Sequence, residues 1–95
     1  MVTDLLKFTI REESLPEAIE HIREQAIIIR EEDGCVMTKV FQSKIKPTEL
    51  FMLVGWQNRK SLERLQVTEF HRRFREDMTN MMALPLEIFD WETVI

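Results

Sequence analysis

The sequence is poor in the residues that form covalent or metal crosslinks, with a single cysteine and two histidines. Cys35 has no second thiol with which to form an internal disulfide. His21 and His71 lie far apart in the chain, without the ligand spacing of a structural zinc site. We therefore expect neither a disulfide nor a metal ion, and we expect Cys35 to be a small buried hydrophobe at the start of a strand.

The sequence also lacks a long apolar run. The longest one, residues 50–56, is far shorter than the ~20 residues that span a bilayer. The first four residues carry no basic side chain, unlike the start of a secretory signal. We therefore expect a cytoplasmic protein that has no membrane partner.

Positive charge is in the minority, because 13 basic residues stand against 17 acidic ones and the net charge is −4. A pI of about 5.2 argues against nucleic acid as a partner. Between residues 35 and 76, however, nine bases stand against four acids. A solvated helix face explains this patch, and steering of an anionic ligand is the alternative. Its helical members are Arg59, Lys60, Arg64, Arg72, Arg73 and Arg75.

The length of the chain favours one domain. Its 95 residues have 44% apolar content, and we expect a single domain over residues 1–95. A chain of this size buries about two-thirds of its unfolded surface at best. If the fold leaves an apolar sheet face uncovered, a second copy of the chain is therefore its simplest cover.

The first half of the chain alternates between strand and helix patterns. Polar and apolar residues alternate over 5–11, which predicts a strand. Ser14 and Glu17 then have the spacing of a capping box, and the apolar residues behind them recur at helical spacing, which predicts a helix over 16–31. A breaker pair at 33–34 precedes a second strand over 35–43.

The second half repeats this order. Residues 50–56 are apolar at nearly every position, which predicts a strand buried on both faces. Asn58 is the expected cap of a short helix over 59–65, and Thr68 is the expected cap of a longer one. That helix carries an apolar stripe and ends before Pro85, after which residues 86–95 alternate as a last strand. The stripe consists of Phe70, Phe74, Met78 and Met81.

The order of elements is strand, helix, strand, strand, helix, strand. It predicts an α+β protein with the ferredoxin-like βαββαβ arrangement, in which both helices pack on one face of an antiparallel sheet. Because the strand over 50–56 is apolar on both sides, the other sheet face must also be covered. We expect a homodimer formed through that face.

Several short segments, in their order and spacing, resemble the antibiotic biosynthesis monooxygenase domain of the dimeric α/β-barrel group, which includes small quinol monooxygenases. The segments are Glu32-Asp33-Gly34-Cys35, Phe41-Gln42-Ser43, Pro47-Thr48-Glu49, Trp56, Ser61-Leu62-Glu63, Phe74 and Pro85-Leu86. The resemblance implies a ferredoxin-like homodimer with a cavity between the sheet and the helices of each subunit. It also implies oxygenation of a small aromatic quinol or polyphenol without a cofactor.

The chain departs from the family pattern at three positions that are commonly polar. The family tends to have a glutamate two positions before the strand-ending tryptophan and two histidines on the helices that follow. This chain has Val54, Leu65 and Phe70 at those positions. His71 lies one residue beyond the last of them, which on a helix is a rotation of ~100°.

The chemistry that the resemblance implies needs a dry cavity and a group that favours the substrate anion. A histidine can take a phenolic proton, and an indole can stack on the ring while it donates one hydrogen bond. We therefore expect His71 and Trp56 to be the catalytic pair. The expected substrate-binding residues are Phe70, Phe74, Met78 and Arg72.

Each of these residues also has a plain structural interpretation. Trp56 would be an ordinary core residue, His71 a half-exposed residue beside the apolar stripe, and Arg72 a surface partner of Glu69 or Glu76. Under that interpretation the domain is a non-catalytic dimeric module that binds a ligand or a partner. A haem-degrading variant of the fold is a third hypothesis, for which His71 would have to face the iron.

Overall fold

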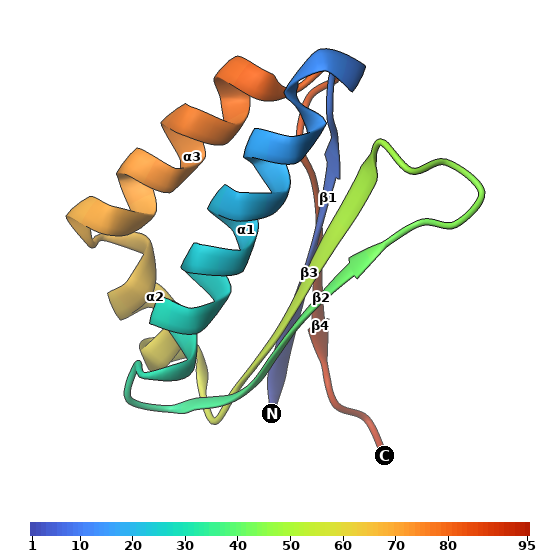
Figure 1. Cartoon of the computed structure of the whole chain (residues 1–95). Coiled ribbons are helices and arrows are strands. Elements are labelled where there is room, and N and C mark those ends of the chain that lie inside the picture. The colour runs from blue at the N-terminus through green and yellow to red at the C-terminus, as the bar shows by residue number, and fades with distance from the viewer.

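The computed structural model describes residues 1–95 as a sheet covered on one face by helices (Figure 1). The sheet has four antiparallel strands in the order β2-β3-β1-β4. The order of elements confirms the predicted ferredoxin-like arrangement, with the second helical segment divided in two. None of its helices combines the length and apolar character needed to cross a membrane. The elements are β1 (Val2–Thr9), a 3-10 turn (Glu12–Ser14), α1 (Leu15–Arg30), β2 (Cys35–Gln42), β3 (Glu49–Trp56), α2 (Arg59–Gln66), α3 (Glu69–Met81) and β4 (Glu87–Glu92).

Strand β1 begins three residues before the start that the sequence predicts, and it ends at Thr9 rather than at residue 11. From Val2 onward the strand is paired with β3 on one side and with β4 on the other. Hydrogen bonds to both neighbouring strands keep residues 2–4 extended, although the alternation of polar and apolar residues does not reach them. As a result, Asp4 lies inside the sheet, on the same face as Leu6 and Phe8.

Helix α1 begins as predicted, but without the predicted capping box. The Ser14 side chain accepts no hydrogen bond from the helix, and its φ of −100° and ψ of −1° are helical. An N-cap residue normally has extended dihedral angles that aim its oxygen at the first free N–H groups. Because the 3-10 turn leads directly into α1, Ser14 cannot adopt these extended angles. The prediction of a Ser14–Glu17 capping box is therefore wrong.

The two caps predicted in the second half are confirmed. The Asn58 Oδ1 accepts a hydrogen bond from the Ser61 amide at 3.0 Å, and the Thr68 Oγ1 accepts one from the His71 amide at 3.4 Å. The apolar stripe of α3 is rotated from its predicted position, because Phe70 is only half-buried whereas His71 is 8% exposed. The buried face of α3 is therefore His71, Phe74, Met78 and Met81.

Strand β3 is apolar on both faces, as its sequence predicts. Leu50, Met52, Val54 and Trp56 are buried beneath the helices. On the opposite face Phe51 and Leu53 are only half-buried, because no helix covers them (Figure 1). Neighbouring strands add exposed aromatic side chains to this open face, namely Phe41, Phe89 and Trp91.

The caps supply a matched test of local stability. We expect Asn58→Ala to lower the free energy of unfolding by about 1 kcal/mol, because the Ser61 amide loses its acceptor. Ser14→Ala should change it by less than about 0.5 kcal/mol, because the Ser14 side chain caps nothing. Urea denaturation at one fixed protein concentration measures both. Equal losses in the two variants would contradict the assignment.

Candidate functional site

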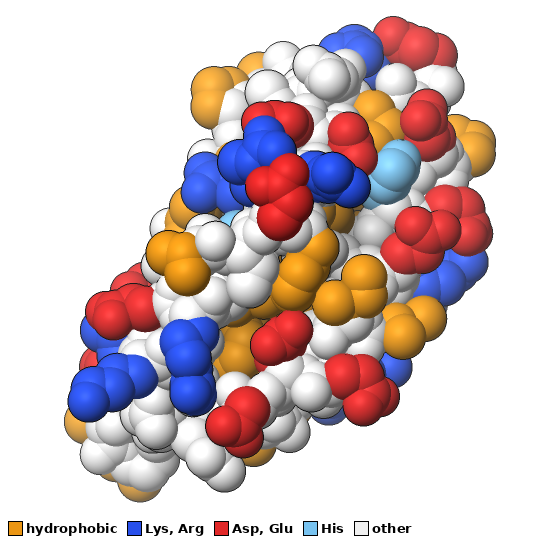
Figure 2. Space-filling model, turned by 90° about the vertical axis from the view of Figure 1, so that its left-hand side faces the viewer, with side chains coloured by type: hydrophobic (Ala, Val, Ile, Leu, Met, Phe, Trp, Pro, Cys, Tyr) orange, Lys and Arg blue, Asp and Glu red, His pale blue; other side chains and the backbone are white.

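A cavity of about 300 Å³ lies between the sheet and the helices, and most of its walls are apolar. Strands β1 and β3 form its floor, and helices α2 and α3 form its roof. The space-filling view of the helix-covered side shows apolar side chains set among charged ones of both signs (Figure 2). The cavity is at the lower end of the ~300–1,000 Å³ range of small-molecule sites. Representative apolar walls are Leu6, Phe8, Met52, Val54, Leu62 and Phe74.

Three buried polar atoms of the cavity residues make no hydrogen bond within the protein. They are the Oδ1 of Asp4, the Nε1 of Trp56 and the Nδ1 of His71. A buried polar atom without a partner costs roughly 1–3 kcal/mol, so such atoms are rare unless they have a purpose. Because all three residues line the cavity, a ligand there is a potential partner for each of these atoms.

Trp56 lies at the end of β3 and is fully buried. Its backbone is held in register by Val2 of β1 and Cys35 of β2. This pairing holds the indole in the sheet layer, where it forms part of the cavity wall. The ring offers an apolar face for stacking and one N–H donor.

His71 lines the cavity from α3, in the first turn after the Thr68 cap. The pKa of His71 is lowered, mainly because burial disfavours the charged imidazolium and also because Arg75 carries a like charge. The imidazole is therefore neutral at neutral pH. A neutral imidazole keeps one nitrogen as a hydrogen-bond acceptor, which is the state that a general base requires.

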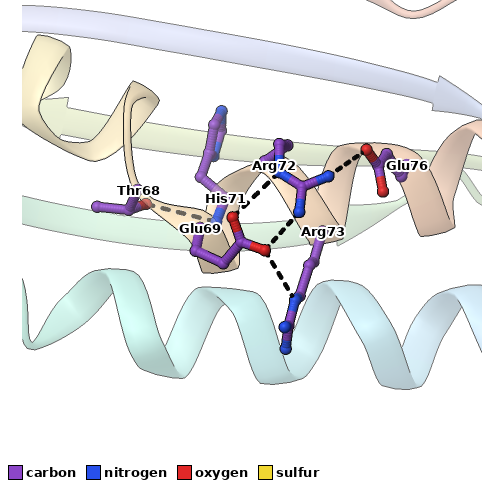
Figure 3. Close-up of polar contacts among 6 residues, drawn as sticks. All are labelled: Thr68, Glu69, His71, Arg72, Arg73 and Glu76. Atoms are coloured by element: carbon purple, nitrogen blue, oxygen red, sulfur yellow. Dashed lines mark hydrogen bonds and ion pairs between the residues drawn. The ribbon is translucent and has the colours of Figure 1, made fainter.

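The cation at the cavity is Arg75 and not Arg72. Arg72 lies outside the cavity lining, in ion pairs with Glu69 and Glu76 on the surface of α3. Figure 3 shows this network and His71, which projects from α3 without joining it. Arg75 lines both the apolar cavity and an adjoining polar recess, and none of the ion pairs of the protein includes it.

Of the three apolar residues predicted to bind the substrate, two line the cavity and one does not. Phe74 and Met78 line the cavity, and the Phe74 ring meets Phe8 edge-on with centroids 5.8 Å apart. Phe70 is half-buried against the core and does not line the cavity. Val54 and Leu65, at the positions where the sequence is unexpectedly apolar, form parts of the cavity wall.

Asp4 is a cavity residue that the sequence did not bring to notice. Its pKa is raised to about 6, first because burial disfavours the carboxylate and then because of a hydrogen bond and negative charge from Asp90, while Arg59 partly opposes the rise. The signal was present in the sequence. If the alternation of Leu6, Phe8 and the residues after them is extended toward the N-terminus, Asp4 falls on the inward face.

No group of three or more histidine, cysteine, aspartate or glutamate side chains is arranged to hold a metal ion. Cys35 is half-buried, and its Sγ lies 3.3 Å from the Thr38 Oγ1 at the start of β2. The polar groups of the cavity are therefore two potential proton acceptors, one indole donor, the cation Arg75 and the uncharged side chains of Gln66 and Thr79.

Comparison with known proteins gives one family and a consistent fold. The sequence model of the family described as antibiotic biosynthesis monooxygenase matches residues 1–77. No curated protein sequence matches the chain. Among solved structures, an antibiotic biosynthesis monooxygenase superposes with a TM-score of 0.93 at 18% identity, over 100% of both chains.

Two further structures share the fold at similar identity. Rv0793 from Mycobacterium tuberculosis has a TM-score of 0.93 at 16% identity, over 99% of this chain and 95% of its own. PA3566 from Pseudomonas aeruginosa has a TM-score of 0.89 at 20% identity, over 99% of this chain and 94% of its own. At these identities the structural likeness concerns the fold alone.

The raised pKa of Asp4 predicts a pH-dependent cost in stability. Because its pKa is about 6 in the folded protein against an ordinary value of 3.8, stability is lost as the pH rises through 6. A rise of about two pKa units corresponds to at most roughly 3 kcal/mol. Asp4→Asn should therefore raise the free energy of unfolding by about 1–3 kcal/mol more at pH 8 than at pH 4.

Urea denaturation across this pH range measures the effect. The matched control is Asp77→Asn, which alters an exposed carboxylate on α3 and should change the free energy of unfolding by the same amount at pH 4 and at pH 8. An Asp4→Asn effect that is the same at every pH would show that the buried carboxyl does not titrate in this range.

Proposed function

Because the chain belongs to the antibiotic biosynthesis monooxygenase family, we propose that it is a cofactor-independent monooxygenase that acts on a small aromatic quinol or polyphenol. The observation that carries this proposal is the convergence of the Trp56 Nε1 and the His71 Nδ1, both buried and unpartnered, on one apolar cavity. An apolar pocket with a few unpartnered polar groups suits a flat ring that carries hydroxyl groups.

The reaction that fits this site needs no external reductant. The substrate loses two hydrogens, one atom of O₂ is retained on its carbon and the other leaves as water. The step that the protein can assist is loss of a hydroxyl proton, because the resulting anion is a better electron donor to oxygen than the neutral ring. A dry cavity strengthens every electrostatic interaction with that anion.

The residues divide this work by their chemistry. The neutral imidazole of His71 takes the hydroxyl proton, and the Trp56 ring stacks on the substrate while its N–H donates to a ring oxygen. The positive charge of Arg75 favours an anion in the cavity for the same reason that it disfavours an imidazolium at His71. Phe74 and Met78 supply apolar contact on the helix side.

The size of the cavity bears on the haem hypothesis. A volume of about 300 Å³ suits a compact ring system better than a macrocycle. His71 also lies deep in the wall, 8% exposed, where its pKa is set by burial and by Arg75. We therefore favour a small phenolic substrate over haem.

The second candidate is a non-catalytic ligand-binding or interaction module of the same fold. Val54 and Leu65 support it, because they add hydrocarbon to the cavity wall. Such a module would bind an aromatic compound without consuming oxygen. The two candidates therefore differ in turnover rather than in binding.

We further propose that the chain forms a homodimer through the open face of the sheet. The exposed fractions of Phe41, Phe89 and Trp91 on this face are 47%, 40% and 48%. Phe89 and Trp91 pack together with ring centroids 5.9 Å apart, beside the half-buried Leu5 in the next strand. An apolar patch of this kind marks an interaction site, and a second copy is its simplest cover.

Turnover tests the proposed function directly. We expect oxygen uptake with a panel of quinols, reduced about 100-fold or more by His71→Ala because the general base is lost. Trp56→Phe should reduce it about 10-fold, because the ring remains but one hydrogen bond is lost. Because the pKa of His71 is lowered, the rate should fall only at acidic pH, where the imidazole takes up a proton.

The control for these variants is His21→Ala, since His21 lies on α1 outside the cavity lining. It should keep the wild-type rate. Wild-type rates in His71→Ala and Trp56→Phe would remove both residues from the mechanism, and binding of quinols without oxygen uptake would favour the non-catalytic module.

Assembly is tested by sedimentation at micromolar concentration. We expect a dimer for the wild type and a monomer for the double variant Phe89→Glu/Trp91→Glu, because buried like charges without a partner oppose association. Val67→Glu places a charge on an exposed apolar residue between α2 and α3, and it should remain dimeric. A wild-type monomer would contradict the proposed interface.

A further inference from the structure

Asp4 is one half of a carboxyl pair that runs from the cavity to the edge of the sheet. Asp4 lies directly opposite Asp90 in the register of β1 and β4, so both side chains are on the helix-covered face. The Oδ1 of Asp4 is buried without a partner, whereas the group also hydrogen-bonds to Asp90.

Asp90 differs from Asp4 in both exposure and charge. The Asp90 side chain is 43% exposed on the edge strand, where Arg59 binds both of its oxygens, at 3.1 and 3.3 Å. The hydrogen bonds from Arg59 lower the pKa of Asp90, so this carboxyl stays ionised. When the pair holds one proton, Asp4 is therefore the carboxyl that carries it, and the ionised Asp90 lies beside it at the surface.

We propose that Asp4 and Asp90 form a proton outlet, in which Asp4 accepts the hydroxyl proton of the substrate and Asp90 delivers a proton to solvent. The inference rests on the proposed function and adds a catalytic residue to it. The substrate O–H bond breaks, its electron pair stays on the substrate oxygen, and its proton joins the Asp4 Oδ1. Asp4 then passes a proton to Asp90, which releases it to water.

The charged groups around Asp4 suit this role. Asp90 of β4 and Arg59 of α2 face it from the edge, while His71 and Arg75 of α3 line the same cavity from the helix layer. Strand β3 places no titratable group beside Asp4, because Asp4 lies opposite Val54 and Glu49 lies at the far end of the strand. Among these groups only Asp4 is a buried acid with an ionised acceptor behind it.

His71 alone would be a poor store for the proton. Burial and the charge of Arg75 both disfavour its imidazolium form, so a proton taken there has to leave quickly. The pKa of Asp4, raised to about 6, is close to the value at which a group can accept and release protons at neutral pH. A quinol carries two hydroxyls, and the sheet wall and the helix wall each supply one acceptor.

The first experiment does not depend on turnover. Carboxyl ¹³C NMR titration follows Asp4, whose signal is identified by its absence in Asp4→Asn. We expect a midpoint near pH 6 in the wild type, a lower midpoint in Asp90→Asn, and a change in the Asp4 signal when 2-naphthol is added. The control is Glu92→Gln, which removes another partner of Arg59 on the same strand and should leave the Asp4 midpoint in place.

A midpoint near that of an ordinary aspartate, or an Asp4 signal that does not respond to 2-naphthol, would overturn the proposal whether or not the protein turns over quinols. The 2-naphthol probe carries one hydroxyl on a two-ring system. Its binding therefore reports contact with the Asp4 Oδ1 without requiring oxidation.

The second experiment measures oxygen uptake with menadiol at pH 7, after subtraction of the uncatalysed rate. We expect Asp4→Asn to lower kcat about 100-fold while its affinity for 2-naphthol stays near wild type, because the amide oxygen still accepts a hydrogen bond. Asp90→Asn should also lower kcat, and imidazole added to the buffer should restore part of it. Glu92→Gln should keep the wild-type kcat.

The outcomes separate the two proposals. If the wild type consumes oxygen and Asp4→Asn matches it in rate and pH profile, the outlet is wrong and the monooxygenase function stands. If the wild type consumes no oxygen with any quinol, the proposed function fails, and the NMR titration then decides whether Asp4 contacts a bound hydroxyl. Failure of imidazole to restore Asp90→Asn would remove Asp90 from the proton path.

Discussion

The antiparallel register of β1 against its two neighbours decides which side chains face the helices. In that register Val2 lies opposite Trp56, and Asp4 lies between Val54 and Asp90. A shift of one residue would turn the strand over and bring Leu5 into the cavity in place of Asp4. The arrangement of the cavity therefore depends on the backbone hydrogen bonds of β1 as much as on the side chains that line it.

The polarity of the cavity is maintained against the stability of the fold. Buried polar atoms without partners are unfavourable, each by roughly 1–3 kcal/mol. The apolar core of 16 buried residues, continuous across the sheet and all three helices, offsets this cost. Departures from an all-apolar core concentrate where a protein acts on a ligand. In this protein three of the four residues with a buried, unpartnered polar atom line one cavity, namely Asp4, Trp56 and His71, and the fourth is Gln25 of α1.

Local patterns predicted the features that local hydrogen bonds and alternation produce. The order of elements, the caps at Asn58 and Thr68 and the two-sided apolar β3 all follow from neighbouring residues. The Ser14 cap did not form, because a 3-10 turn before the helix changed its dihedral angles. The positions that are commonly polar in the family are apolar in this chain, and the carboxyl opposite Val54 is that of Asp4 in the neighbouring strand.

By itself the sequence determined the βαββαβ order, the position of Trp56 at the end of β3 and the helix that carries His71, because each depends on periodicity within one segment. Only the tertiary structure decided that Asp4 and His71 share a cavity, and that Arg75 rather than Arg72 lines it. The first depends on pairing between strands distant in the chain, and the second on the rotation of α3 as it packs. Alternation places Asp4 on the inward face of β1, but it does not show which helix residues Asp4 meets. Those contacts, like the rotation of α3, form only when the sheet and helices assemble.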